Sequence, residues 1–305
     1  MAATTLHRLM LAGEAAIYLL LGLVLALRCD WSYGQVLGLI ALMMLAGRAF
    51  IIGVTFAFSR AYAVPAPATG RIGVRQAAVM ATRELAAYFL LFTVVMPFER
   101  FFMGSDRLGR SEGGRLPVLL IHGYQCNRGY WLWLRSRLAR AGWQVATISL
   151  DPVFNDIDGY VEQVSRRIDE VCAAAGTDRL ILVGHSMGGL VSRAYLRVHG
   201  NAKVAKLVTL GSPHHGSQLA VLGLGENGRQ MVPGSAWLAG LNAPGVVPLP
   251  AATVSIYSCQ DNYVMPQDSS LLDGAKVVPL AGIGHLEMAF SPEIERRLLA
   301  ALADR

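Results

Sequence analysis

Two long apolar runs at the start of the chain constrain its fold more than any other feature. The first, Leu9 to Leu27, carries one charged residue, Glu14, and the second, Gly34 to Phe58, carries only Arg48. Each approaches the roughly 20 residues that a helix needs to cross about 30 Å of hydrocarbon. A cleaved signal peptide would be followed by polar sequence, whereas here a second apolar run follows at once. We therefore predict a helical hairpin retained in a membrane, rather than two buried helices of a soluble α domain.

A third apolar run, residues 77–98, is interrupted by Arg83 and Glu84. Its uninterrupted part suits an interfacial or buried helix as well as a span. In an antiparallel hairpin, Glu14 and Arg48 would lie at nearly the same depth, and a third span would bring Arg83 and Glu84 close to that layer. Charges inside a membrane are costly and normally pair. We therefore hypothesise a charge-paired layer near one face of a three-helix bundle.

The composition agrees with a membrane protein, since 53% of residues are hydrophobic and only 16% are charged. The net charge of +6 comes from scattered arginines without interleaved aromatics, so nucleic acid is not an expected partner and the bilayer is. We predict a multi-pass protein of a bacterial inner membrane. Three spans from a cytoplasmic start would place the rest on the periplasmic side, which we favour. Arginines next to the apolar runs are divided between the two orientations. The periplasmic location is supported by Arg8, Arg60, Arg71 and Arg75, and the cytoplasmic location by Arg100, Arg107, Arg110 and Arg115.

Beyond these runs, short apolar strands alternate with helix-length segments, which predicts an α/β fold with a mostly parallel sheet and helices on both faces. We expect membrane-anchoring helices over residues 1–103, in two or three spans, a linker over 104–115 and a catalytic domain over 116–305. The expected strands are 117–121, 144–150, 180–183, 206–210, 253–258 and 276–280, and the expected helices are 130–141, 157–175, 187–199 and 291–302.

The strongest chemical signal is the sequence Gly-His-Ser-Met-Gly at residues 184–188. It has the form G-x-S-x-G and stands between an apolar strand and a helix, where this motif builds a sharp turn that exposes its serine. A side chain at either glycine would collide with such a turn. We therefore predict that Ser186 is a nucleophile.

A nucleophilic serine needs a base, and the base needs an orienting acid. His285 follows the strand 276–280, and Asp261 follows the strand 253–258, so both lie at carboxyl ends of strands, where sites of open α/β sheets gather. The chain order Ser, Asp, His is the one expected for this fold. We predict His285 as the base and Asp261 as its partner. A structural role is expected for His122, and solvated positions for Asp268 and Asp273.

The oxyanion needs two preorganised donors. We predict the backbone amides of Met187, directly after the nucleophile, and of Tyr124, after the turn at Gly123. The four cysteines are scattered without metal-ligand or disulfide spacing, and no cluster of acidic residues is evident. No metal site is expected.

Taken together, the chain resembles bacterial lipases and esterases of the α/β-hydrolase superfamily. The matching motifs are His-Gly at 122–123, Gly-His-Ser-Met-Gly-Gly at 184–189, Gly-Ser-Pro-His-His-Gly-Ser at 211–217, Asp-Asn-Tyr-Val-Met-Pro at 261–266 and Gly-His-Leu at 284–286. The resemblance implies ester hydrolysis through an acyl-enzyme without a cofactor. It also implies a framework role for His214 and His215, and a possible lid over residues 217–247, for which an ordinary helical insertion is the alternative.

The sequence thus predicts a membrane-anchored serine hydrolase, a lipase or esterase acting on lipid-like carboxylic esters. Two other functions stay open. An acyltransferase would use the same three residues with an alcohol or amine in place of water. A membrane scaffold would keep the fold without catalysis, although the complete set of catalytic residue types speaks against it.

Overall fold

The computed structural model describes residues 1–65, 70–111 and 114–304. The later part of the chain forms a six-stranded sheet in the order β2-β1-β3-β4-β5-β6, with every neighbouring pair parallel. All six strands fall within a few residues of their predicted positions, which confirms the parallel α/β sheet. They are β1 (Val118–Ile121), β2 (Val145–Ile148), β3 (Leu180–His185), β4 (Val204–Leu210), β5 (Val254–Ser258) and β6 (Lys276–Leu280).

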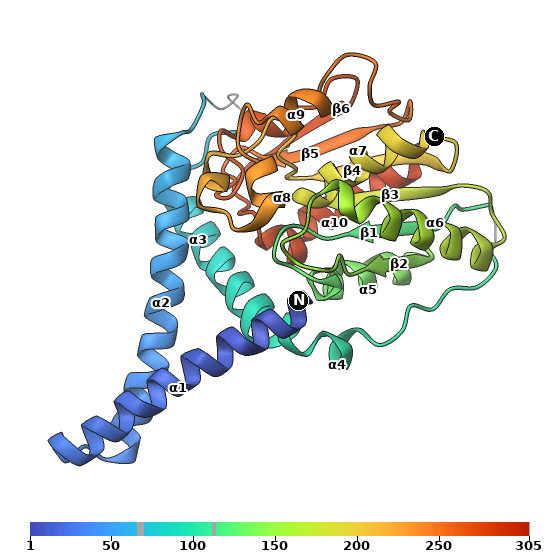
Figure 1. Ribbon diagram of the computed structural model, residues 1–305. Coiled ribbons are helices and arrows are strands. Elements are labelled where there is room, and N and C mark those ends of the chain that lie inside the picture. The colour runs from blue at the N-terminus through green and yellow to red at the C-terminus, as the bar shows by residue number, and fades with distance from the viewer. Residues whose placement is uncertain (66–69, 112–113, 305) are drawn as a thin grey trace.

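Helices cover both faces of this sheet, because its strands are apolar on both sides. Along β1, Leu119 and Ile121 belong to one buried cluster and Val118 and Leu120 to the other. Helices α6 and α7 contribute to the first cluster, and α5 and α10 to the second (Figure 1). The helices of this domain are α5 (Leu132–Arg140), α6 (Val161–Ala175), α7 (Met187–His199), α8 (Gly225–Gln230), α9 (Ala236–Leu241) and α10 (Pro292–Ala303).

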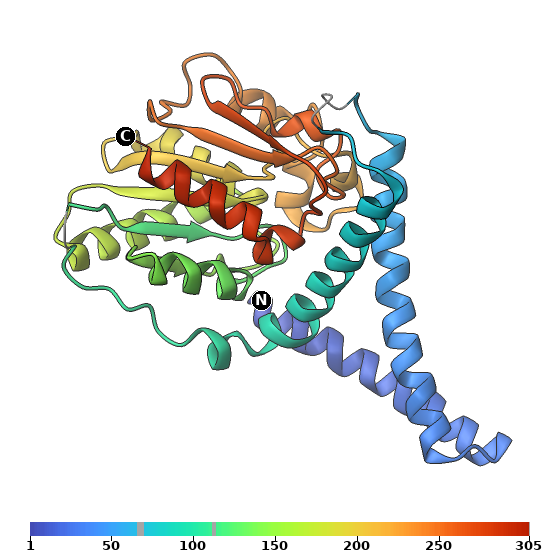
Figure 2. The same ribbon diagram turned by 180° about the vertical axis from the view of Figure 1, so that it is seen from behind.

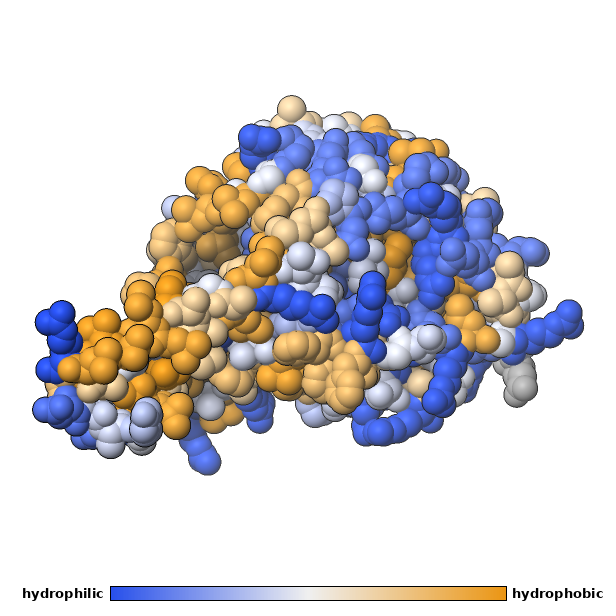
Figure 3. Space-filling model, turned by 60° about the horizontal axis from the view of Figure 1, so that its bottom comes forward, coloured by the Kyte–Doolittle hydropathy of each residue, from blue (hydrophilic) through white to orange (hydrophobic). Residues whose placement is uncertain are grey.

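Before the sheet domain, the described residues are mostly helical, as predicted. Among the described residues, three segments are long and apolar enough to cross a membrane: α1 (Ala3–Cys29), α2 (Tyr33–Ala61) and the stretch from Val74 to Met103. The last comprises α3 (Val74–Phe89), a π-helical part (Leu90–Val95), a short 3₁₀ turn and α4 (Glu99–Met103). Figures 1 and 2 show α1 and α2 projecting from the sheet domain as a hairpin, with α3 lying between α2 and that domain. Apolar residues gather over the hairpin in Figure 3.

The two ends of the hairpin are attached to the sheet domain by hydrogen bonds. Near the start of α1, His7 Nε2 lies 2.9 Å from the carbonyl oxygen of Gln125. Near the end of α2, Ser59 Oγ donates to the carbonyl oxygen of Asp261 at 2.7 Å. The helices leave the domain beyond these contacts, and each projecting part has about 20 residues, enough to cross a bilayer. Both ends of the hairpin therefore lie on the side of the sheet domain.

The hypothesis of a charge-paired layer is confirmed for one pair and wrong for the other two residues. Arg48 Nη1 and Nη2 donate to the two carboxylate oxygens of Glu14 at 2.7 and 2.9 Å. Glu84, in contrast, is completely buried against the sheet domain, and Arg83 lies 3.5 Å from Glu287 of that domain. The reason is that α3 packs along the sheet domain, so its charges meet protein groups there and not the hairpin.

The segment that we interpret as a linker contacts the sheet domain over its first part. Asp106 accepts hydrogen bonds from the backbone amide of Thr147 at 2.7 Å and from Arg167 Nη2 at 2.6 Å. Residues 112 and 113 lie outside the described residues.

Candidate active site

Ser186 occupies a sharp turn between β3 and α7. Its backbone has φ 54° and ψ −126°, a conformation that residues other than glycine rarely adopt. The turn brings the chain so close to itself that a Cβ on Gly184 would stand 2.6 Å from the backbone of Gly188, and one on Gly188 would stand 2.2 Å from the carbonyl oxygen of Ile121. This crowding explains the two glycines that the motif requires. The strained turn holds Ser186 at the N-terminus of α7, where free amides favour negative charge.

Asp261 and His285 meet at the carboxyl ends of β5 and β6. The Nδ1 atom of His285 lies 2.8 Å from Oδ2 of Asp261, and both side chains are buried. The other carboxylate oxygen of Asp261 accepts hydrogen bonds from the amides of Tyr263 and Val264, both at 2.8 Å. These amides fix the carboxylate, and the carboxylate in turn fixes the imidazole with Nε2 available for proton transfer.

The surroundings of His285 favour its protonated form. Burial by itself lowers the pKa of this imidazole, but the charge of Asp261, the hydrogen bond to it and the charge of Glu84 outweigh burial, so the pKa of His285 is raised above 6.5. An imidazole with a raised pKa is a stronger base and holds a proton taken from a hydroxyl more firmly.

The third predicted member, Ser186, lines the same pocket as His285. Among the described residues, the structure gives no hydrogen bond between Ser186 Oγ and His285 Nε2. Hydrogen bonds of this kind are often long in unliganded enzymes and tighten when substrate binds. The structure therefore brings Asp261 and His285 together and places Ser186 on the wall of the pocket that His285 also lines.

The loop after β1 lies directly against the serine. A Cβ on Gly123 would stand only 2.8 Å from Cβ of Ser186, so the next residue, Tyr124, starts beside the nucleophile. Met187 is the first residue of α7, so its backbone N–H has no acceptor within that helix. Among the described residues no hydrogen bond engages the amide of Tyr124 or Met187. Both are thus free to receive an oxyanion.

His122 braces this loop, as expected from the sequence. Its Nε2 accepts a hydrogen bond from the amide of Leu150 at 3.0 Å, and its Nδ1 lies 2.9 Å from the carbonyl oxygen of Gly123. Burial lowers the pKa of His122 to about 4, so the ring stays neutral and can accept from Leu150. His214 is likewise buried, with Nε2 3.1 Å from Thr209 Oγ1, inside the framework and away from the catalytic pocket.

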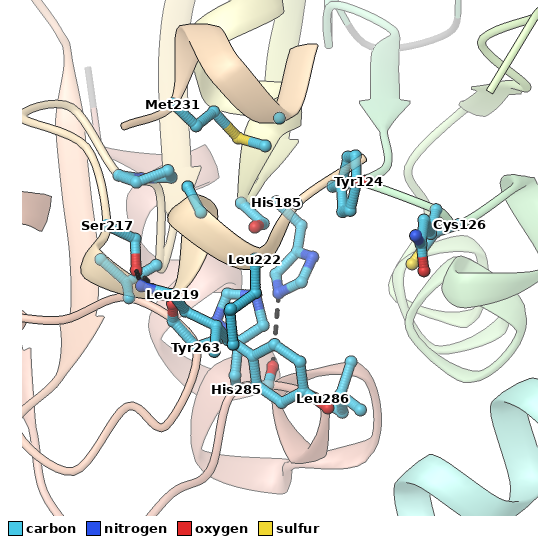
Figure 4. Close-up of a pocket in the computed structure, with 18 of the residues that line it drawn as sticks. Tyr124, Cys126, His185, Ser217, Leu219, Leu222, Met231, Tyr263, His285 and Leu286 are labelled. Atoms are coloured by element: carbon cyan, nitrogen blue, oxygen red, sulfur yellow. Dashed lines mark hydrogen bonds between the residues drawn. The ribbon is translucent and has the colours of Figure 1, made fainter. Parts of the chain in front are cut away.

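A largely apolar pocket of about 250 Å³ opens over Ser186 and His285 (Figure 4). Part of its wall comes from the 3₁₀ helix Gln218–Leu222, which lies within the segment that we predicted as a possible lid. Val221, within this helix, and Leu224, two residues after it, are more than 60% exposed and add apolar surface beside the pocket. The apolar lining side chains are Phe92, Leu219, Ala220, Leu222, Met231, Val264 and Leu286. Within the part of the chain that the structure describes, no group of three potential metal ligands is present.

The N-terminal helices also hold the loops of the acid and the base, a role that sequence reasoning missed. The carboxylate of Glu84 accepts hydrogen bonds from the amides of Leu286 at 3.0 Å and Glu287 at 2.8 Å, directly after His285. On α2, Ser59 binds the backbone of Asp261.

Thr55, also on α2, reaches the same loops through Asn262. The side-chain amide of Asn262 donates to Thr55 Oγ1 at 2.8 Å, and its oxygen accepts from the amide of His285 at 3.0 Å. In the sequence, these contacts are indicated only by a carboxylate or hydroxyl side chain within an otherwise apolar helix. No sequence pattern predicts which residue that side chain contacts.

The parallel sheet, the strained serine turn and the histidine–carboxylate pair define the α/β-hydrolase fold. Solved structures agree. A mature lipase of Bacillus licheniformis superposes with a TM-score of 0.57 at 18% sequence identity. The superposition covers 65% of this chain and 96% of the lipase. Lipase B of Aspergillus fumigatus gives a TM-score of 0.58 at 19% identity, with 70% of this chain and 58% of its own covered.

Sequence comparisons find similarity to known proteins over the middle of the chain. Residues 117–233 match the family described as palmitoyl protein thioesterase. A triacylglycerol lipase of Pseudarthrobacter phenanthrenivorans is 35% identical over 114 residues, which cover 35% of each protein. A palmitoyl-protein thioesterase–dolichyl pyrophosphate phosphatase fusion of Schizosaccharomyces pombe is 30% identical over 146 residues, 42% of this chain and 24% of the fusion. The chain spans about a third or less of the length of these two relatives. The chain thus has the α/β-hydrolase fold, and its middle part is similar to lipases and thioesterases.

Proposed function

We propose that this protein is a membrane-anchored serine hydrolase that cleaves carboxylic esters of lipid-like substrates through an acyl-enzyme. The observation that carries the proposal is the 2.8 Å pairing of His285 with Asp261 on the wall of an apolar pocket that also contains Ser186. The matches to triacylglycerol lipases and to the palmitoyl protein thioesterase family support an acyl group as the part of the substrate that is recognised.

In the proposed mechanism, Ser186 Oγ attacks the ester carbonyl while His285 Nε2 takes its proton. Asp261 holds the imidazole in the tautomer with hydrogen on Nδ1 and stabilises the imidazolium that forms. The amides of Tyr124 and Met187 receive the oxyanion. His285 then protonates the leaving alcohol, and water, activated by the same imidazole, releases the acid.

The hairpin of α1 and α2 is the proposed membrane insert, with two crossings. Its ends both contact the hydrolase domain, through His7 and Ser59, which supports an even number of crossings. The expected periplasmic location depended on three crossings, and these contacts speak against it. With two crossings, the arginines Arg8, Arg60, Arg71 and Arg75 lie on the side of the hydrolase domain and favour the cytoplasmic side.

Within this scheme, residues 1–103 form the anchor, with α3 as the part that joins the hairpin to the hydrolase domain. Residues 104–115 form the linker and residues 116–305 the catalytic domain. The segment 217–247 is the proposed cover of the acyl pocket, since Leu219, Leu222 and Met231 line that pocket.

The test uses the full chain purified in detergent. We expect Ser186→Ala to abolish labelling by a fluorophosphonate and to lower turnover of p-nitrophenyl esters by about 10⁴-fold or more. A Ser192→Ala variant serves as control, because Ser192 is a buried serine of α7 that bonds Gly188 within its own helix. Near-normal turnover by the Ser186 variant would refute the assignment. Absence of labelling in the unmodified protein would support the scaffold, and ester products with an added alcohol would support acyl transfer.

A further inference from the structure

A second cavity lies among the N-terminal helices, outside the catalytic pocket. It measures about 270 Å³ and is enclosed by α1, α2 and the α3 segment. Two of its lining residues, Met10 and Ile51, are 60% and 42% exposed on the projecting part of the hairpin. The cavity is therefore bordered by exposed apolar side chains of both α1 and α2. Its lining residues are His7, Met10, Leu11, Glu14, Gly47, Arg48, Ile51, Tyr88 and Phe92.

A single layer of side chains separates this cavity from the catalytic pocket. Phe92 lines both spaces. Its ring packs between His7, at a centroid distance of 5.3 Å, and Tyr88, at 4.9 Å. His7 in turn contacts Gln125, since His7 Nε2 lies 2.9 Å from the carbonyl oxygen of Gln125. Gln125 lines the catalytic pocket.

The charged residues of the cavity are satisfied by each other. The carboxylate of Glu14 accepts hydrogen bonds from both terminal nitrogens of Arg48. Arg48 Nε donates a further hydrogen bond to Thr93 Oγ1 at 3.1 Å. Since these groups already have partners, the cavity offers its other walls, which are mainly apolar, to a ligand. A hydrocarbon chain fits such walls, whereas a polar headgroup would compete with a completed ion pair.

We propose that this cavity is a lateral entrance through which the acyl chain of a bilayer lipid passes between α1 and α2 to the catalytic pocket, with Phe92 as the gate. The inference rests on the proposed hydrolase function and names its substrate class, an acyl lipid drawn from the membrane. Short soluble esters reach Ser186 through the mouth of the catalytic pocket and do not need this route.

Gly47 offers a direct way to block the entrance. It lines the cavity, and a Cβ built on it would meet no heavy atom within 4 Å outside its own stretch of helix. A Cβ at this position therefore meets open space, and Gly47→Phe is chosen to fill the cavity. Gly53, on the same helix, also has open space around a Cβ but does not line the cavity, so Gly53→Phe is the matched control for Gly47→Phe.

Both variants and the unmodified protein are reconstituted in phosphatidylcholine vesicles and assayed with p-nitrophenyl butyrate in solution and p-nitrophenyl palmitate in the bilayer. We expect Gly47→Phe to lower palmitate turnover about tenfold while butyrate turnover stays within about twofold. Gly53→Phe is expected to leave both rates unchanged. Palmitate turnover by Gly47→Phe equal to that of Gly53→Phe would overturn the proposal.

A second variant tests the gate if Gly47→Phe does not fold. Phe92→Ala joins the two spaces, and we expect it to raise the ratio of palmitate to butyrate kcat/KM by about threefold or more. An unchanged ratio would count against the lateral entrance. These outcomes are distinct from failure of the hydrolase function, because in that case butyrate is not cleaved and a fluorophosphonate does not label Ser186 in any variant.

Discussion

The carboxylate of Glu84 accepts a hydrogen bond from the backbone amide of Leu286, the residue that follows His285, at 3.0 Å. Glu84 belongs to a helix of the N-terminal segment and has no exposed surface. It fills the space beside the loop so closely that a Cβ on Gly284 would stand 2.3 Å from its carboxylate. The N-terminal segment thus reaches the loop of the proposed base, so its role is not limited to the membrane attachment proposed above.

We therefore expect Glu84→Ala to affect both folding and activity. The change leaves two buried amides without acceptors, and each costs about 1–3 kcal/mol. Displacement of the His285 loop is expected to lower kcat/KM by about 100-fold, chiefly through kcat. Thermal unfolding and ester hydrolysis measure the two effects. Arg83→Gln, which alters an exposed neighbour, is the control and is expected to behave like the unmodified protein.

Glu84→Gln separates a positioning role from a merely structural one. The glutamine keeps an oxygen acceptor but removes a charge that raises the pKa of His285. We expect partial recovery of activity relative to Glu84→Ala, together with an acidic limb of the kcat/KM profile that moves to lower pH. A profile that overlays that of the unmodified enzyme would show that the charge has no influence on the base.

The pH dependence follows from the raised pKa of His285. Because the free imidazole is the active form, the acidic limb of kcat/KM is expected to have its midpoint above pH 6.5. Asp261→Asn removes the largest group raising this pKa, so the limb moves to lower pH while kcat falls by about 10⁴-fold. Stability changes with pH in the opposite direction to activity. The pKa of His285 is higher in the folded than in the unfolded chain, so its pairing with Asp261 stabilises the fold fully below pH 6.5. This contribution is lost as the pH rises through the folded pKa of His285.

We expect the free energy of unfolding to fall in acid because of His122. Its pKa is lowered to about 4 in the folded state, so the unfolded chain binds a proton more readily. Stability is then complete above the unfolded pKa and falls as the pH drops toward 4, by up to about 3 kcal/mol. Urea unfolding at several pH values measures this slope. The slope is expected to be smaller in His122→Asn, and an equal slope in both proteins would exclude His122 as its source.

The ion pair in the hairpin gives a prediction about the membrane segment. Arg48→Leu leaves Glu14 in an apolar setting without its partner, so we expect a marked drop in the unfolding temperature of the detergent-solubilised protein. Adding Glu14→Leu is expected to restore part of the loss, because the double change removes both charges. Additive effects of the two substitutions would contradict a coupled pair.

The sequence alone predicted the sheet and the places of the site residues at strand ends better than it predicted how the two parts of the chain fit together. Strands and helices of the hydrolase domain were predictable because apolar runs of the right length alternate there, and Ser186 was predictable because its turn demands glycines at fixed positions. Asp261 and His285 were predicted from strand ends and their expected chain order. The contacts of Glu84 and Ser59 were not predictable, since they join residues about 200 positions apart and no local pattern encodes such a pairing.

Most of the residues that α2 and α3 hold in the hydrolase domain come from its last third, around Asp261 and His285. During synthesis the hairpin therefore emerges long before its partners exist. It can enter the bilayer first, but it gains these contacts only when the final strands have been made. The proposed activity is accordingly expected to appear only at the end of maturation, when the last-made loops reach α2 and α3.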